Sequence, residues 1–227
     1  MNISKSQRLE IANAIKAQES NTAGEIYCVV ARRSDDYSDI ITLYAILAAL
    51  FLPLAYGLLN IHLVETVISS AGSDWNAEDP QTGLLGLIAR MIGLQTIIFI
   101  IGALIAKNPK ISNLLVPKFI KRQIVHKAAI DQFNSHGIAQ TEGQTGVLIY
   151  VSLAEHMVEI LADKGIYSKV DKSIWGEAIT KILLHTKSGN MAMGLIEGIE
   201  MVGSILAQHF PPSAINHNEL TDGVVFI

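Results

Sequence analysis

The run from Ile40 to Val64, IITLYAILAALFLPLAYGLLNIHLV, contains no formal charge and is dominated by Leu, Ile and Ala. At about 1.5 Å per residue, a helix of roughly 25 residues spans ~37 Å, more than the ~30 Å hydrocarbon core of a bilayer. Pro53 can kink such a helix without preventing it from spanning. A second run from Leu84 to Ala106, LLGLIARMIGLQTIIFIIGALIA, is interrupted only by Arg90, which lies near one end and can snorkel towards the headgroups. The two runs predict a two-helix transmembrane hairpin.

The alternative interpretation is a buried hairpin within a soluble protein. Two apolar runs of this length exceed the usual length of core helices, so the membrane interpretation is favoured. Half of the 227 residues are hydrophobic and 17% are charged, and the apolar bias is concentrated in the hairpin. Outside it, the composition is that of an ordinary globular domain.

The distribution of basic residues predicts the orientation of the hairpin. Basic residues lie on both of its flanks: Arg32 and Arg33 before it, and Lys107, Lys110, Lys118, Lys121 and Arg122 after it. The connecting segment from Glu65 to Gly83 contains acidic residues and neither Lys nor Arg. The positive-inside rule therefore predicts two spans in a bacterial inner membrane with both termini in the cytoplasm. The charged first twenty residues lack the apolar core of a signal peptide, which agrees with a cytoplasmic N-terminus.

Helical and strand-like segments alternate on both sides of the hairpin. The expected helices are 4–18, 117–136, 171–187 and 190–209, and the expected strands are 25–31, 146–151 and 157–162. This order predicts an α/β fold, a small α/β/α sandwich interrupted by the transmembrane hairpin. We expect a discontinuous domain of residues 1–36 and 112–212, a hairpin of residues 37–111, and a loosely docked C-terminal tail of residues 213–227.

Four segments of the predicted domain carry a family resemblance. They are TAGEIYCVV (22–30), AIDQFNSHGI (129–138), TGVLIYVS (145–152) and EILADKGI (159–166). In order and spacing they resemble the TPM domain. That family includes thylakoid lumen proteins linked to photosystem II repair, bacterial membrane-anchored proteins and a receptor-associated animal protein. The resemblance implies a TPM-like sandwich, and acid phosphatase activity and calcium binding have been proposed for some members.

Polar residues are expected at the carboxyl ends of the first two strands, where open α/β sheets place their sites. These residues are Ser34, Asp35, Asp36, Ser152, Glu155 and His156. Asp35, Asp36 and Glu155 could supply the hard oxygen ligands that Ca²⁺ or Mg²⁺ prefers, and a solvated acidic loop is the alternative. Asp163, at the end of an antiparallel third strand, should lie at the opposite edge.

No catalytic signature occurs in the sequence: there is no P-loop, no G-x-S-x-G elbow and no H-E-x-x-H. The net charge of −4 argues against nucleic-acid binding, and the single Cys28 excludes an intrachain disulfide. The leading hypothesis is a non-enzymatic, membrane-anchored scaffold or assembly and repair factor for a membrane complex. The alternative is a divalent-cation-dependent phosphatase at the cytoplasmic membrane face, and a transporter subunit is a third hypothesis. Whether the protein is an enzyme is left open.

Overall fold

The structure is a computed structural model that describes residues 3–59, 84–141, 143–212, 220–221 and 223–227. The chain divides into two compact units, of which the first comprises Met1–Asp35 and Lys118–Ile227 and the second comprises Asp36–Pro117. The sequence-based boundaries at residues 36 and 112 differ from these mainly because a short helix before Pro117 belongs to the second unit.

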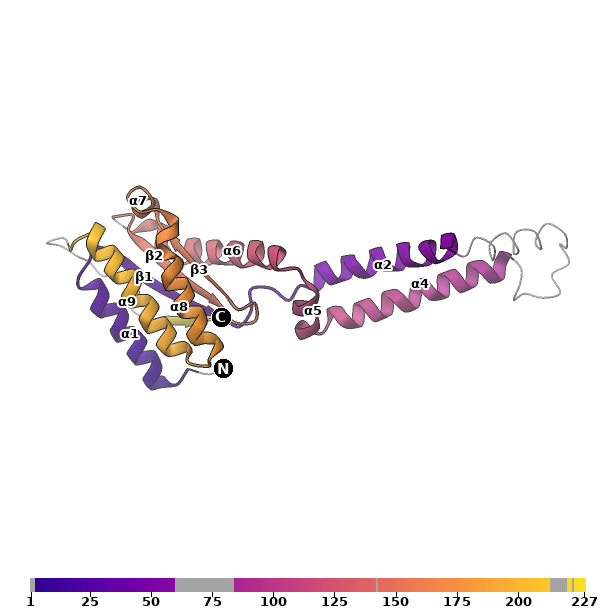
Figure 1. Ribbon diagram of the computed structural model, residues 1–227, viewed down its shortest axis with the longest axis horizontal. Helices are drawn as coiled ribbons and strands as arrows, with labels where there is room; N and C mark the ends of the chain where they lie inside the picture. The colour runs from indigo at the N-terminus through magenta and orange to yellow at the C-terminus, as the bar shows by residue number, and fades with distance from the viewer. Residues whose placement is uncertain (1–2, 60–83, 142, 213–219, 222) are drawn as a thin grey trace. The chain divides into compact units, whose positions relative to one another are not determined.

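The first unit is built on a four-stranded mixed sheet with the order β3-β2-β1-β4 (Figure 1). β1 (Glu25–Ala31) and β2 (Gly146–Ser152) are parallel and in register, with Val29 beside Tyr150. This confirms the pairing of two strands that lie on opposite sides of the apolar hairpin in the sequence. β3 (Met157–Ala162) returns antiparallel to β2, also as predicted.

The fourth strand, β4 (Val224–Phe226), corrects the prediction of a loosely docked tail. β4 pairs in parallel with β1, and two backbone hydrogen bonds extend the pairing past its last residue: Ile227 N donates to Val30 O, and Arg32 N donates to Ile227 O. An unpaired edge of β1 would leave its backbone groups without partners, and β4 satisfies them. The β-branched and aromatic composition of VVFI is typical of a strand.

Three helices cover one face of the sheet: α1 (Lys5–Glu19), α8 (Gly176–Lys187) and α9 (Met191–His209). Alternate strand residues such as Cys28 and Ile149 pack with Ile15 and Ile199 in this larger core. α6 (Lys118–Ser135) covers the other face, where Tyr27 and Leu148 belong to a smaller core. The result is an α/β/α arrangement, because successive side chains of a strand point to opposite faces. Three short helices complete the unit: η1 (Ile138–Gln140), α7 (Lys164–Tyr167) and η2 (Lys172–Trp175).

Local sequence signals explain where the first helix begins. Ser4 is the N-cap of α1: its side chain accepts from Gln7 N at 3.2 Å, and the Gln7 side chain accepts from Ser4 N at 2.9 Å. This reciprocal capping box satisfies two of the four amide groups that a helix start leaves unpaired.

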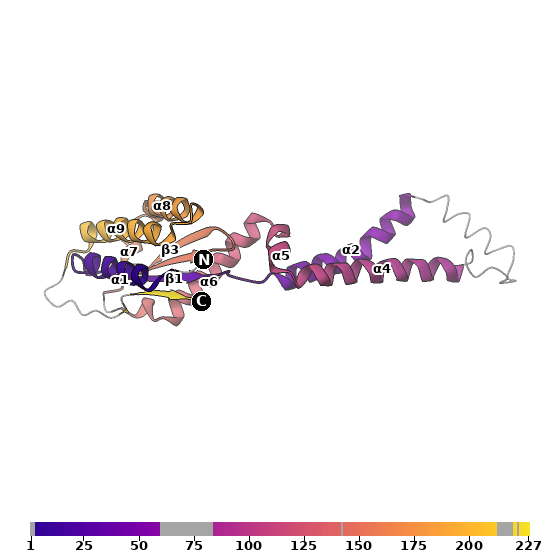
Figure 2. The same ribbon diagram turned by 90° about the horizontal axis from the view of Figure 1, so that it is seen from below.

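The second unit contains two long apolar helices, α2 (Ser38–Leu59) and α4 (Leu84–Ala106), which pack against each other (Figure 2). Gly102 makes their close approach possible, since a Cβ at this position would lie 2.2 Å from the Cβ of Ala45. A seven-residue helix, α5 (Pro109–Leu115), follows α4. The end of the first predicted span, residues 60–64, and the acidic connecting segment lie outside the described residues.

Three described helices are long and apolar enough to cross a membrane: segments Ser38–Leu58 of α2, Ile88–Ala106 of α4, and the whole of α9. They differ in how much of their apolar stretch is buried by the rest of the protein. The buried share of an 18-residue stretch is 22% for α2, 0% for α4 and 50% for α9. The two hairpin helices therefore present apolar side chains outward, whereas α9 packs into the core of the first unit.

Candidate functional site

The candidate site lies at the carboxyl ends of the parallel strands β1 and β2. The chain turns after each strand, and two hydrogen bonds hold the turns together: Leu153 N donates to Ala31 O, and Ala154 N donates to Arg32 O, both at 3.0 Å. These bonds bring Ser34, just after β1, next to the 153–156 turn that joins β2 to β3. The edge that the sequence predicted is therefore formed within the first unit.

Four polar side chains form one hydrogen-bonded cluster there. The Ser34 hydroxyl donates to Ser152 Oγ at 2.8 Å and lies 3.0 Å from the Tyr150 hydroxyl. The Ser152 hydroxyl donates in turn to Glu155 Oε2, which also accepts from Ser34 N at 3.3 Å. We call Ser34, Tyr150, Ser152 and Glu155 the hydroxyl–carboxylate cluster.

Burial sets the electrostatics of this cluster. Ser152 is 0% exposed, Tyr150 1% and Glu155 7%. Burial raises the pKa of the Tyr150 phenol; the Ser34 hydrogen bond opposes this shift, and the charge of Glu155 adds to it. Tyr150 is therefore a neutral phenol at physiological pH. The Glu155 carboxylate accepts from the Ser152 hydroxyl and from the Ser34 backbone N–H.

The cluster resembles a nucleophile–base pair in composition but not in accessibility. A serine hydroxyl that donates to a carboxylate is the arrangement from which nucleophilic catalysis can start. Ser152 is fully buried, however, so its oxygen cannot approach a substrate in this conformation. The geometry instead ties the end of β1 to the β2–β3 turn, with the buried carboxylate satisfied by donors from both segments.

The three predicted metal ligands have different surroundings. Glu155 belongs to the cluster, Asp35 is exposed, and Asp36 lies in the second unit. Asp36 Oδ1 accepts from the Ser38 backbone N at 3.1 Å and from the Ser38 hydroxyl at 2.9 Å, at the start of α2. Across the part of the chain that is described, no group of three or more His, Cys, Asp or Glu side chains is placed to hold a metal ion. The Ca²⁺ or Mg²⁺ site stays a prediction.

Asp163 lies at the opposite edge of the sheet, as predicted. Its backbone N donates to Gly146 O at the start of β2, and its side chain accepts from Lys164 N as the N-cap of α7. Glu19 is also buried near this edge and accepts from Ile26 N at 2.8 Å. The two carboxylates satisfy backbone amides where a helix and a strand begin.

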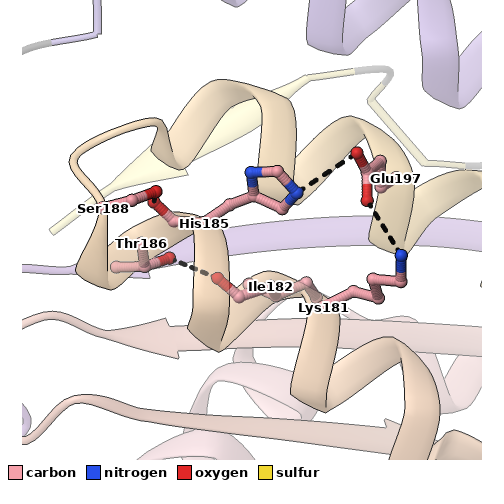
Figure 3. A network of polar contacts seen from close by, with 6 residues as sticks. All are labelled: Lys181, Ile182, His185, Thr186, Ser188 and Glu197. Carbon is pink, nitrogen blue, oxygen red and sulfur yellow. Dashed lines mark hydrogen bonds and ion pairs between the residues drawn. The ribbon is translucent and has the colours of Figure 1, made fainter.

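The histidines have separate partners. His185 on α8 lies 3.2 Å from Glu197 on α9, and Lys181 Nζ lies 3.8 Å from the same carboxylate (Figure 3). His136 contacts the Tyr27 hydroxyl at 3.1 Å, and His126 lies 3.5 Å from Glu159. These contacts link neighbouring helices and strands in pairs.

Sequence reasoning found Ser34, Ser152 and Glu155 from the rule that sites gather at strand carboxyl ends. It missed Tyr150, because this residue lies inside a continuous apolar run that indicates a buried strand but not which polar group lies close to the phenol. The structure shows that Tyr150 is the third residue from the end of β2, on the face that α6 covers, with its hydroxyl at Ser34.

Comparisons with known proteins bear on the fold. Residues 107–205 match the family model described as the TPM domain. The structure is similar to the NMR structure of the BA42 protein from the psychrophilic bacterium Bizionia argentinensis, with a TM-score of 0.57 and 20% sequence identity. The similarity covers 100% of this chain and 97% of that one. No curated protein matches the chain. The match to the TPM-domain model over residues 107–205 and the shared fold agree with the resemblance of the four sequence segments to the TPM domain.

Proposed function

We propose that this protein is a membrane-anchored TPM-domain protein that acts as a non-enzymatic scaffold or assembly and repair factor for a membrane complex. The observation that carries the proposal is the outward-facing apolar surface of α2 and α4. Many large hydrophobic residues on these helices are 38% to 66% exposed, including Phe51, Leu54, Phe99 and Leu104. A soluble monomer rarely exposes a continuous apolar surface of this size, and a bilayer would cover it.

The proposal assigns two spans rather than three. α9 has comparable length, but Leu195, Ile199 and Val202 pack at 0% exposure in the core against the sheet. Its exposed side carries Glu200 and Ser204. A helix with half of its apolar window buried in a domain core cannot also be inserted in lipid without unfolding that domain.

The orientation follows from charge. Lys107, Lys110, Lys118, Lys121 and Arg122 follow the second span, and no acidic residue occurs between Asp79 and Asp131. The positive-inside rule then puts both ends of the chain in the cytoplasm of a bacterial cell, at the inner membrane. Reporter enzymes that are active only in the periplasm test this when fused at Gly72 and at Ile227. We expect activity at Gly72 alone; activity at Ile227 alone would reverse the orientation.

A binding role is favoured over hydrolysis by the burial of the cluster. Ser152 is inaccessible, and the Glu155 carboxylate already accepts two hydrogen bonds from its own domain. A partner would instead recognise the surface around this edge, near Arg32 and Arg33, which are exposed. The partner class that suits an anchored domain is another membrane protein, because anchoring limits its diffusion to the plane of the bilayer.

The alternative is a divalent-cation-dependent phosphatase, for which Asp35, Asp36 and Glu155 would provide oxygen ligands. It is favoured by the position of Glu155 at the carboxyl ends of parallel strands, where α/β enzymes bind ligands. The two functions are separated by assaying the purified full chain with a chromogenic phosphate ester, with and without Mg²⁺ or Ca²⁺. The scaffold proposal predicts no turnover above that of the E155Q chain. Cation-dependent turnover that E155Q abolishes would replace it with the phosphatase.

A further inference from the structure

The short helix α5 has two contrasting sides. Ser112 is fully buried, and Val116, directly after the helix, is 3% exposed. The rest of the helix surface presents large apolar side chains: Ile111 is 41% exposed, Leu114 83% and Leu115 50%. Leu114 is among the most exposed large hydrophobic residues described in the chain. A seven-residue helix with such a side is unlike an ordinary connecting turn, which is polar.

Hydrogen bonds and packing fix α5 against the hairpin. The buried Ser112 hydroxyl is 3.2 Å from Ile105 O and 3.4 Å from Ala106 O, two carbonyls at the end of α4. Asn108 is the N-cap of α5 and accepts from Lys110 N at 3.2 Å. α5 also contacts both α2 and α4, and it turns away from the direction of α4 at the foot of the hairpin (Figure 2). The exposed side of α5 therefore has a defined position at one end of the two apolar helices.

The charges beside this apolar side are positive. Lys107 directly follows α4, and Lys110 lies in the first turn of α5. Both are exposed. Large apolar side chains next to lysines, at the end of an apolar helix pair, form the pattern of an interfacial helix that binds an anionic membrane surface.

We propose that α5 lies in the headgroup layer of the bilayer and binds anionic phospholipid. Ile111, Leu114 and Leu115 enter the boundary between headgroups and acyl chains, and Lys107 and Lys110 bind the lipid phosphates. This inference rests on the proposed membrane anchor, and adds to it a lipid-binding collar at the cytoplasmic end of the hairpin. Its function is to fix the depth of the hairpin and to favour anionic lipid around it.

The test uses the full chain in lipid nanodiscs with single engineered cysteines labelled with a nitrobenzoxadiazole fluorophore. The native Cys28 is fully buried and does not compete for the label. Labels at L114C on α5, F99C on α4 and L184C on α8 are compared for reduction by aqueous dithionite. Leu184 is 60% exposed in the first unit and is the matched control. We expect reduction at position 114 to be at least tenfold slower than at 184, and position 99 to be protected.

A second readout tests the headgroup assignment. Quenching of the label at 114 is compared for doxyl-labelled phosphatidylglycerol and doxyl-labelled phosphatidylcholine. We expect a preference for the anionic lipid of roughly fivefold per lysine. The K107Q/K110Q chain should lose most of this preference, and the K164Q/K187Q chain, which removes the same charge elsewhere, should keep it. I111C provides a second labelling site on α5 if the L114C chain does not fold.

Each other result overturns a defined part of the account. Rapid reduction at 114 with protection at 99 would place α5 in water and remove the inference while leaving the anchor intact. Rapid reduction at both 99 and 114 would remove the proposed anchor as well. Equal quenching by the two lipids, or a preference that survives K107Q/K110Q, would overturn the assignment of the lysines to lipid phosphates.

Discussion

The hydroxyl–carboxylate cluster predicts a specific energetic coupling between Ser152 and Glu155. Ser152→Ala removes a fully buried hydroxyl that donates to the Glu155 carboxylate and accepts from Ser34. A hydrogen bond to a charged group contributes about 1.5–3 kcal/mol, and the Ser34 hydroxyl loses its acceptor as well. We therefore expect Ser152→Ala to lower the free energy of unfolding by roughly 2–3 kcal/mol.

A double-mutant cycle isolates the coupling. Glu155→Gln keeps the shape of the side chain and removes its charge, so the hydrogen bond from Ser152 becomes weaker. Because the two residues interact, the double variant should lose less stability than the sum of the losses in the two single variants. We expect this difference, the coupling energy, to be about 1–2 kcal/mol. Thr180→Ala, on the exposed side of α8, serves as a control expected to change stability by less than ~0.5 kcal/mol.

The assay is chemical unfolding of the full chain in detergent micelles, followed by tryptophan fluorescence. Trp175 is 1% exposed in the core of the first unit, so its emission reports on this domain. A Trp75→Phe background removes the other tryptophan. Additive effects in the cycle, or a Ser152→Ala change within the range of the control, would refute the claim that this cluster ties the two strand ends together.

Three further predictions address other parts of the molecule. Gly102→Val should separate α2 from α4, because even a Cβ at this position would lie 2.2 Å from the Cβ of Ala45. Crosslinking between cysteines placed in the two helices should then fall sharply. Gly93→Val, which has open space around it, should leave the crosslinking unchanged. Because the pKa of Tyr150 is raised in the folded protein, the unfolded chain loses this phenolic proton at a lower pH than the folded chain does. The free energy of unfolding should therefore fall as pH rises above about 10. Tyr150→Phe should flatten this dependence in unfolding measured from pH 8 to 11. Glu197→Gln removes the partly exposed ion pair with Lys181 and weakens the contact with His185, and it should cost less than about 1 kcal/mol in thermal unfolding. A loss above about 1 kcal/mol would contradict the view that these contacts are minor.

Much of the fold could be predicted from the sequence because its signals are local. The apolar runs of β1 and β2 indicate buried strands, and two buried strands must share a covered sheet even when a hairpin separates them. β4 was missed because a three-residue strand after a polar segment has too little periodicity to be recognised. α5 was also missed, although Asn108 followed by Pro109 is a typical helix start.

The candidate site was predictable only to the level of the sheet edge. Topology brings Ser34, Ser152 and Glu155 to that edge, but which hydroxyl donates to which oxygen depends on side-chain geometry that no spacing encodes. Asp36 illustrates the difficulty: an acidic residue before a helix is equally consistent with a metal ligand and with a cap, and here it accepts hydrogen bonds from Ser38. Its neighbour Asp35 is exposed and offers no local signal to decide between the two roles.

The central claim is that α2 and α4, and not α9, hold the protein in the membrane. The most direct measurement is alkaline carbonate extraction of membranes carrying either the full chain or a chain in which residues 36–117 are replaced by a short Gly-Ser linker. We predict that the full chain stays in the membrane pellet, and that the shortened chain appears in the soluble fraction with the circular dichroism of a folded α/β domain. Release of the full chain by carbonate would contradict the membrane anchor, and retention of the folded shortened chain in the pellet would show that another segment, such as α9, binds the membrane.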